Sequence, residues 1–153
     1  MQRKQYKKEV KPRDASQLSV GIVVARFNND ITDTMLQGAL ETLHEWNVAE
    51  KNIYVLHVPG SFEIPFGCLW LLTRHKLDAI LTIGCIINGE TDHDKYLAHA
   101  TTEGIMRVSL DHHIPISLGV ITTNNLKQAQ VRSSGKTNKG REAAIAALEL
   151  AMV

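Results

Sequence analysis

The stretch 84–93 reads GCIINGETDH, and it predicts the end of a buried strand followed directly by the start of a helix. The apolar run that begins at Ala79 stops at Asn88-Gly89, a dipeptide typical of a turn. Open α/β folds bind their ligands at the carboxyl ends of the strands, so this stretch would bring its polar residues to a binding edge. A helix start offers free backbone N–H groups to an anion, and His93 would stand beside it, ready to move protons.

Strands and helices alternate on both sides of this stretch. Short apolar runs rich in β-branched residues predict strands at 18–25, 52–58, 79–87 and 116–121. Apolar residues at helical spacing and capping residues predict helices at 31–46, 61–75 (capped by Ser61), 94–111, 126–132 and 140–151. Such an order predicts a single three-layer α/β domain, in which helices flank both faces of a four-stranded parallel sheet with right-handed crossovers.

The composition is typical of a globular domain, but the charge is distributed unevenly along the chain. Hydrophobic residues make up 44% of the 153 residues, enough for one domain with a core. Basic residues crowd into residues 1–13, so we expect residues 1–17 to be a flexible N-terminal arm and residues 18–153 to be the folded domain. The remainder is slightly acidic, which argues against a nucleic-acid-binding domain.

The two cysteines, Cys68 and Cys85, lie in apolar runs, which predicts buried free thiols and a reducing compartment. Their spacing is not that of a zinc site. The N-terminus lacks the apolar stretch of a signal peptide, and no segment is apolar over the length that a bilayer requires. We therefore expect a cytoplasmic protein with no membrane association and no bound metal.

Unusual residues follow the ends of the predicted strands, at 25–28 (ARFN), 58–63 (VPGSFE), 88–93 and Thr122-Thr123. Taken singly, each has an ordinary structural explanation. Phe27 could be a core aromatic, Pro59-Gly60 a simple turn, Glu63 a partner of a helix dipole, and His93 one of seven histidines on the surface. Parallel topology would nevertheless bring all four groups to one edge of the sheet.

Four segments together resemble the signatures of the lumazine synthase family: 25–28 (ARFN), 58–65 (VPGSFEIP), 89–96 (GETDHDKY) and 138–140 (NKG). The resemblance extends in register from about residue 20 to the C-terminus, and four motifs in this order are highly specific. It implies a flavodoxin-like topology and a homopentamer. It also implies a cofactor-independent enzyme that condenses 5-amino-6-(D-ribitylamino)uracil with 3,4-dihydroxy-2-butanone 4-phosphate to 6,7-dimethyl-8-ribityllumazine, the penultimate step of riboflavin biosynthesis.

The resemblance also implies a role for each matching residue. His93 would be the general acid and base. Phe27 would stack on the pyrimidine ring, whose substituents would be held by Ser61, Phe62 and Glu63. The remaining implied positions are Cys85, Ile86, Ile87 and Leu118 for the pyrimidine substrate, Glu90, Thr91 and Arg132 for the phosphate, and Asn28 and Lys139 as auxiliary residues.

The resemblance also implies how the subunits assemble. The family builds its active site between adjacent subunits, so Leu118 and Arg132 would be contributed by a neighbouring subunit. Leu118 stands where many members of the family carry a phenylalanine, and Glu90 brings a carboxylate into a loop whose backbone would bind phosphate. The short linker 133–138 favours a 60-subunit icosahedral shell. Such a shell could enclose riboflavin synthase as a partner enzyme.

Two other functions remain open on the sequence alone. A flavodoxin-like module that binds a flavin or nucleotide would share the topology, and Phe27 could stack on its ring. However, the Gly-rich dinucleotide fingerprint does not follow the first predicted strand. The other alternative is a shell protein that has lost its activity, and the presence of both His93 and Arg132 argues against it.

Overall fold

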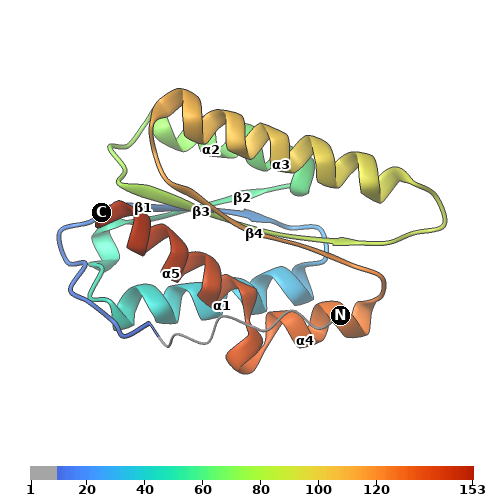
Figure 1. Ribbon diagram of the computed structural model, residues 1–153, viewed down its shortest axis with the longest axis horizontal. Coiled ribbons are helices and arrows are strands. Elements are labelled where there is room, and N and C mark those ends of the chain that lie inside the picture. Colours follow the sequence, from blue (N-terminus) through green and yellow to red (C-terminus); the bar gives the residue numbers. More distant parts are fainter. Residues whose placement is uncertain (1–9) are drawn as a thin grey trace.

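Four parallel strands form the middle of three layers (Figure 1). The computed structural model describes residues 10–153. The strands are β1 (Val20–Ala25), β2 (Ile53–Val58), β3 (Ala79–Ile87) and β4 (Ile116–Thr123). Their spatial order is β2-β1-β3-β4, which is the order that begins a flavodoxin-like sheet.

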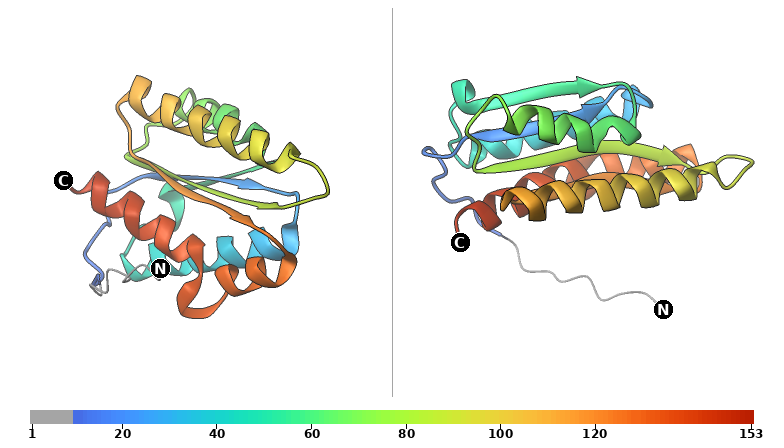
Figure 2. Two further views of the ribbon diagram at one scale, coloured as in Figure 1. Left: turned by 45° about the vertical axis from the view of Figure 1, so that its right-hand side comes forward. Right: turned by 90° about the horizontal axis from the view of Figure 1, so that it is seen from above.

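Helices cover both faces of this sheet. One face carries α1 (Asn29–Glu45), α4 (Leu126–Ser133) and α5 (Lys139–Ala151), and the other carries α2 (Ile64–Leu72) and α3 (His93–His112), as Figures 1 and 2 show. Three short 3₁₀ turns complete the described chain: η1 (Glu50–Asn52), η2 (Ser61–Glu63) and η3 (Gly135–Thr137). The predicted three-layer parallel α/β fold is therefore confirmed. Among residues 10–153, none of the helices combines the length and the apolarity that crossing a bilayer requires.

The elements agree with the sequence prediction to within two residues at each end, except around the second helix. Thr122 and Thr123, which were predicted to follow the fourth strand, instead belong to β4, because they pair with Ile86 and Ile87 of β3. Strand β3 has the predicted bounds because its run is apolar apart from Thr82 and nearly all buried. The helix predicted at 61–75 instead begins as the 3₁₀ turn η2, and the α-helix α2 starts only at Ile64. Pro65 suits the first turn of a helix, where its missing N–H costs no hydrogen bond. The prediction that Ser61 caps this helix is wrong, since its side chain forms no cap bond within the described chain.

Alternate residues of the strands point to opposite faces and form two apolar cores. Ile22 and Leu81 pack with α1 and α5 around Met35 and Leu148. On the other face, Val23 and Ile80 pack against the buried side chains of α2, which are Ile64, Cys68 and Leu71. The central strands β1 and β3 are buried on both faces in this way, so the segments at their ends stand on a rigid platform.

The first described residues pack against the body of the protein. The backbone N–H of Ala15 donates to the carbonyl of Trp46 at 2.7 Å, and the Ala15 side chain is buried. The Arg13 guanidinium lies 5.5 Å from the centre of the Trp46 ring. Within the arm expected at 1–17, residues 10–17 are thus tied to the end of α1, because Ala15 has apolar surface to bury. Residues 1–9 of that arm lie outside the described residues.

The motif 138–140 holds α5 tightly against α1. Asn138 is only 4% exposed. Its Oδ1 accepts hydrogen bonds from the N–H groups of Gly140 and Arg141, and its Nδ2 donates to the Thr34 carbonyl of α1 at 3.1 Å. A Cβ atom at Gly140 would overlap the carbonyl oxygen of Met35. The close approach of the two helices therefore requires both the asparagine and the glycine.

We expect Gly140→Ala to lower the free energy of unfolding by about 1–3 kcal/mol, the usual cost of an overpacked contact. An alanine in an unconstrained helix position would instead stabilise the protein. Thermal unfolding measures the difference. Gly89→Ala is the matched control, because a Cβ there meets nothing within 4 Å. A Gly140→Ala protein as stable as the native chain would contradict this description of the α1–α5 contact.

Candidate active site

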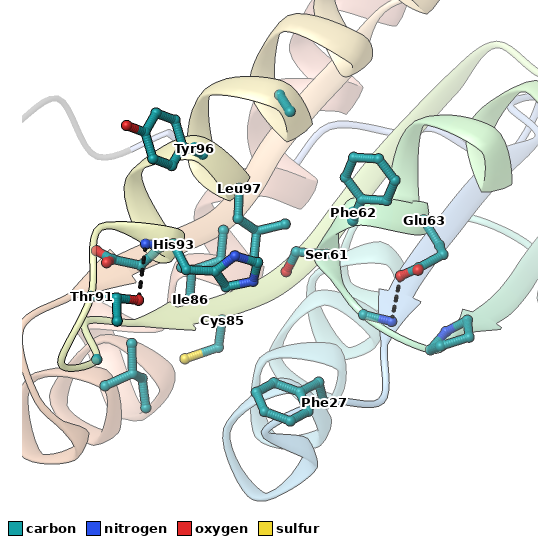
Figure 3. A pocket seen from close by; sticks show the side chains of 16 residues that line it. Phe27, Ser61, Phe62, Glu63, Cys85, Ile86, Thr91, His93, Tyr96 and Leu97 are labelled. Carbon is teal, nitrogen blue, oxygen red and sulfur yellow. Dashed lines mark hydrogen bonds between the residues drawn. The ribbon is translucent and has the colours of Figure 1, made fainter.

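A cavity of about 830 Å³ opens where the carboxyl ends of the strands meet the start of α3 (Figure 3). We call it the strand-end cavity. The residues predicted from the sequence that line it are Phe27, Ser61, Phe62, Glu63, Cys85, Ile86, Ile87, Thr91 and His93. They come from the turn after β1, from η2, and from the segment that runs from the end of β3 to the start of α3, and the parallel sheet brings these three together. The fourth predicted group, Thr122-Thr123, does not line this cavity.

Two phenylalanine rings stand exposed on the walls of this cavity. Phe27 is 71% exposed and Phe62 is 65% exposed, and Figure 3 shows them on different sides of the cavity. The loop that carries Phe27 is pinned to the end of β2, because the Phe27 N–H donates to the Pro59 carbonyl at 3.0 Å. Exposed rings on a fixed backbone suit a flat heterocycle, which can stack on an aromatic face.

Glu63 and Ser61 provide polar groups between these rings. One carboxylate oxygen of Glu63 accepts a hydrogen bond from the Gly60 N–H at 2.9 Å, which fixes the side chain and leaves the second oxygen for a ligand. Ser61 is 6% exposed and lies between Phe62 and the His93 ring in Figure 3. A Cβ atom at Gly84 would come within 2.6 Å of the Ser61 hydroxyl oxygen, so only glycine leaves room for it there.

His93 is the first residue of α3, and its ring lies at the centre of the view in Figure 3. The backbone N–H of His93 donates to the Thr91 hydroxyl at 3.4 Å. Leu97 and Ala100 also line the cavity, one and two turns further along α3. The sequence prediction omitted them, although their helical spacing from His93 places them on the same face. It also omitted Pro59, Gly60, Gly89, Asp94 and Tyr96.

Cys85 lies on the floor of the cavity with its thiol buried. Burial raises the pKa of this thiol to about 11, and the negative charge of Asp30 adds to the rise. Burial also raises the pKa of Cys68 to about 12. The prediction of two buried free thiols is confirmed. A thiol that stays protonated at neutral pH is a poor nucleophile, so Cys85 shapes the cavity without attacking a ligand.

Five of the predicted site residues lie outside the cavity lining: Asn28, Glu90, Leu118, Arg132 and Lys139. Leu118 is 53% exposed on β4, where it lines a separate hollow of about 420 Å³. Arg132 lies in the last turn of α4 and donates to the Gln128 carbonyl at 3.2 Å, whereas Lys139 pairs with Glu142 at 2.8 Å. Among residues 10–153, no lysine or arginine lines the strand-end cavity.

Asn28 lies behind the cavity wall and not in its lining. Its side-chain Nδ2 donates to the backbone carbonyl of Cys85 at 2.9 Å. That carbonyl is therefore already occupied, which leaves the later peptide groups of β3 to meet a ligand. Within the described part of the chain, His, Cys, Asp and Glu side chains do not gather in a group of three that could hold a metal ion.

The chemistry of the cavity follows from these groups. The rings of Phe27 and Phe62 suit a flat ligand, the start of α3 suits an anion, and His93 suits proton transfer. The family model of 6,7-dimethyl-8-ribityllumazine synthase matches residues 17–153.

Three relatives named 6,7-dimethyl-8-ribityllumazine synthase illustrate the similarity. The protein of Porphyromonas gingivalis is 42% identical over 135 residues, which cover 88% of this chain and 84% of the relative. That of Buchnera aphidicola subsp. Acyrthosiphon pisum is 45% identical over 138 residues, covering 89% and 86%. That of Bacteroides fragilis is 42% identical over 134 residues, covering 87% and 94%. The chain therefore belongs to the 6,7-dimethyl-8-ribityllumazine synthase family of enzymes.

Proposed function

We propose that this chain is the lumazine synthase of riboflavin biosynthesis. It condenses 5-amino-6-(D-ribitylamino)uracil with 3,4-dihydroxy-2-butanone 4-phosphate to form 6,7-dimethyl-8-ribityllumazine, phosphate and two molecules of water. One observation carries the proposal: Phe27, Glu63 and His93, from three segments far apart in the sequence, line a single cavity in a chain that belongs to this family. The cavity volume of about 830 Å³ suits small-molecule substrates.

The pyrimidine substrate would lie between the exposed rings and the end of β3. Its ring would stack on Phe27, and its ribityl hydroxyls would donate to the free oxygen of Glu63. The hydroxyl of Ser61 and the peptide groups of Ile87 supply further partners at the cavity wall. Each of these groups is held by the sheet or by η2, so the substrate would meet a preformed surface.

The phosphate substrate would bind at the start of α3. Gly89 and Thr91 line the cavity there, whereas the Glu90 side chain lies outside the lining. Backbone N–H groups and the positive end of the helix dipole would hold the phosphate, and Glu90 would contribute only its backbone.

A cation for that phosphate would come from a second subunit. The described chain brings neither Arg132 nor Lys139 into its own cavity, and a phosphate dianion in a site without a cation is poorly compensated. Large apolar side chains stand exposed on α2 and α3, among them Phe66, Met106 and Leu110. Surfaces of this kind favour contact with another protein, which supports a homopentamer with shared sites. Leu118 and Arg132 would then face the neighbouring cavity.

The chemistry needs proton transfers and no change of oxidation state overall. The amine attacks the ketone, and the resulting carbinolamine loses water to form an imine. Phosphate leaves by elimination, and ring closure then expels a second water. His93 would donate and accept protons in these steps, while the neutral Cys85 thiol takes no part. Holding two reactive substrates side by side would supply much of the acceleration.

The proposal extends to the setting of the enzyme. The reaction would be the penultimate step of riboflavin biosynthesis, and the free buried thiols suit the reducing cytoplasm. The short linker between α4 and α5 favours a 60-subunit shell that could enclose riboflavin synthase. In this proposal the reaction needs no cofactor, and the protein binds neither nucleic acid nor membranes.

The direct test mixes the purified chain with both substrates and follows the lumazine product by its absorbance. Product formed well above the slow uncatalysed rate supports the proposal. A folded, assembled sample that forms product only at the uncatalysed rate would reject the proposal. A yellow protein that carries stoichiometric flavin and shows no turnover would favour the flavin-binding alternative instead.

We expect His93→Ala to slow turnover by about 10²- to 10⁴-fold, because proton transfer by a positioned side chain contributes that much. Activity should not vanish, since the two substrates are still held together. Steady-state kinetics measure the effect. His112→Ala, on the same helix but outside the cavity, is the matched control and should keep native rates. Native turnover in the His93→Ala enzyme would remove the histidine from the mechanism.

We expect Arg132→Ala to weaken the use of the phosphate substrate most, because a guanidinium pairs with phosphate through two parallel hydrogen bonds. The apparent KM for 3,4-dihydroxy-2-butanone 4-phosphate should rise more than that for the pyrimidine. Lys127→Ala on the same helix controls for a general loss of positive charge. An unchanged apparent KM for the phosphate substrate would contradict this role.

Coexpression of His93→Ala and Arg132→Ala chains tests whether one site uses two subunits. In a ring of randomly mixed subunits, about one quarter of the interfaces would combine the native His93 of one chain with the native Arg132 of the next. We therefore expect the mixed assembly to exceed the mean activity of the two separate variants several-fold. Activity equal to that mean would show that both residues act within one chain.

A further inference from the structure

Strand β3 extends past the end of β1, and the side chain of Asn28 takes the place of the missing strand. The register of the two strands ends with Val24 opposite Ile83. Beyond this pair, the N–H groups of Arg26 and Phe27 both donate on the β2 side, to the carbonyls of Val58 and Pro59. The Asn28 carboxamide donates instead to the Cys85 carbonyl, 57 residues away in the sequence, at 2.9 Å.

The hydrogen bonds of β3 show which of its peptide groups remain for a ligand. The N–H groups of Ile80 and Asn88 donate to Pro115 and Thr123, so the even-numbered residues of β3 direct their peptide groups toward β4. Successive residues of a strand alternate, so odd-numbered residues face the β1 side. Asn28 holds the Cys85 carbonyl on that side. Ile87 is the next residue with this orientation, and it lines the cavity beyond the end of β1.

The backbone of Asn28 is fixed as firmly as its side chain. It adopts the left-handed conformation, with φ 60° and ψ 46°, at the N-terminal cap of α1. Its carbonyl accepts hydrogen bonds from the N–H groups of Ile31 and Thr32, both at 3.0 Å. Within the described chain, its side chain forms no bond to the helix that it caps. The Asn28 carboxamide therefore bonds to β3, whereas only the Asn28 backbone caps α1.

We propose that Asn28 is a positioning residue for the pyrimidine substrate, an inference that rests on the function proposed above. Its carboxamide fixes the Phe27 ring, which would stack on the heterocycle, relative to the Ile87 peptide groups, which would pair with the edge of that heterocycle. The phosphate end of the site lies at the start of α3 and does not depend on this hydrogen bond. Loss of the bond should therefore weaken the binding of the pyrimidine substrate but not that of the phosphate substrate.

Two substitutions separate this role from helix capping. Asn28→Gly keeps the left-handed backbone without strain but removes the carboxamide. Asn28→Asp keeps the shape but places a carboxylate against the Cys85 carbonyl, so two acceptors face each other. If Asn28 acts by positioning, the glycine variant should bind the pyrimidine substrate more tightly than the aspartate variant does. Capping alone gives the opposite order, because aspartate caps a helix better than glycine and its charge favours the helix dipole.

The experiment measures the apparent KM for each substrate, kcat, and the dissociation constant of the lumazine product by fluorescence titration of the full chain. We expect Asn28→Gly to raise the pyrimidine KM and the product dissociation constant on the order of tenfold, as loss of a bond to a largely buried carbonyl does. Asn28→Asp should raise both further. The apparent KM for the phosphate substrate should change by less than about twofold in either variant.

Asn47→Gly is the matched control. Asn47 also has a left-handed backbone, with φ 63°, but it follows the opposite end of α1. This variant should retain native binding and native kinetics. If Asn28→Asp fails to fold, Asn28→Gly decides alone, because it preserves the backbone conformation.

The outcomes distinguish two kinds of failure. Asn28 variants that bind the product and the pyrimidine as the native chain does, in an active enzyme, would overturn the positioning role. Equal losses for the two substrates would also overturn it, since they would point to a general structural defect. A native chain that makes no lumazine would instead reject the function on which the inference rests.

Discussion

The difference in length between β1 and β3 is the constraint on which the site depends. β1 pairs with β3 only as far as Ile83, yet β3 continues to Ile87 between the helix layers. A sheet that stayed paired to its end would have no open backbone edge at this point. Because β1 stops early, its chain turns away at Phe27, and the end of β3, which stays paired with β4 but is open on the β1 side, becomes the floor of a cavity. The buried apolar side chains of β3 fix that floor, since both faces of the strand are packed.

The helices and η2 supply functional groups that the sheet itself lacks. The start of α3 adds backbone N–H groups and the His93 ring, and η2 adds an aromatic ring and a carboxylate. Positive charge is the missing element, because lysine and arginine side chains of residues 10–153 do not reach the cavity. Binding of the proposed phosphate-ester substrate would therefore give this enzyme a physical reason to share its site between chains. The exposed apolar side chains of α2 and α3 give it the surface to do so.

The sequence predicted most of the fold because its strands are nearly pure apolar runs, and β3 was predicted to the residue. Ser61 misled the prediction because a serine before a helix is a common cap, whereas here Pro65 sets the helix start. The motif 138–140 was associated with the site by resemblance, but its asparagine and glycine serve the α1–α5 contact. Leu97 and Ala100 could have been found from helical spacing. The bond from Asn28 to Cys85 could not, because local patterns carry no information on partners 57 residues apart.

A crystal structure of the full chain with the lumazine product and inorganic phosphate would test these ideas most directly. We expect the heterocycle to stack on Phe27 and to pair with the Ile87 peptide groups, while Asn28 keeps its bond to Cys85. The phosphate should lie at the start of α3, with Arg132 of a second subunit against it. A product bound away from the end of β3, or a phosphate held without a guanidinium from another chain, would contradict the site described here.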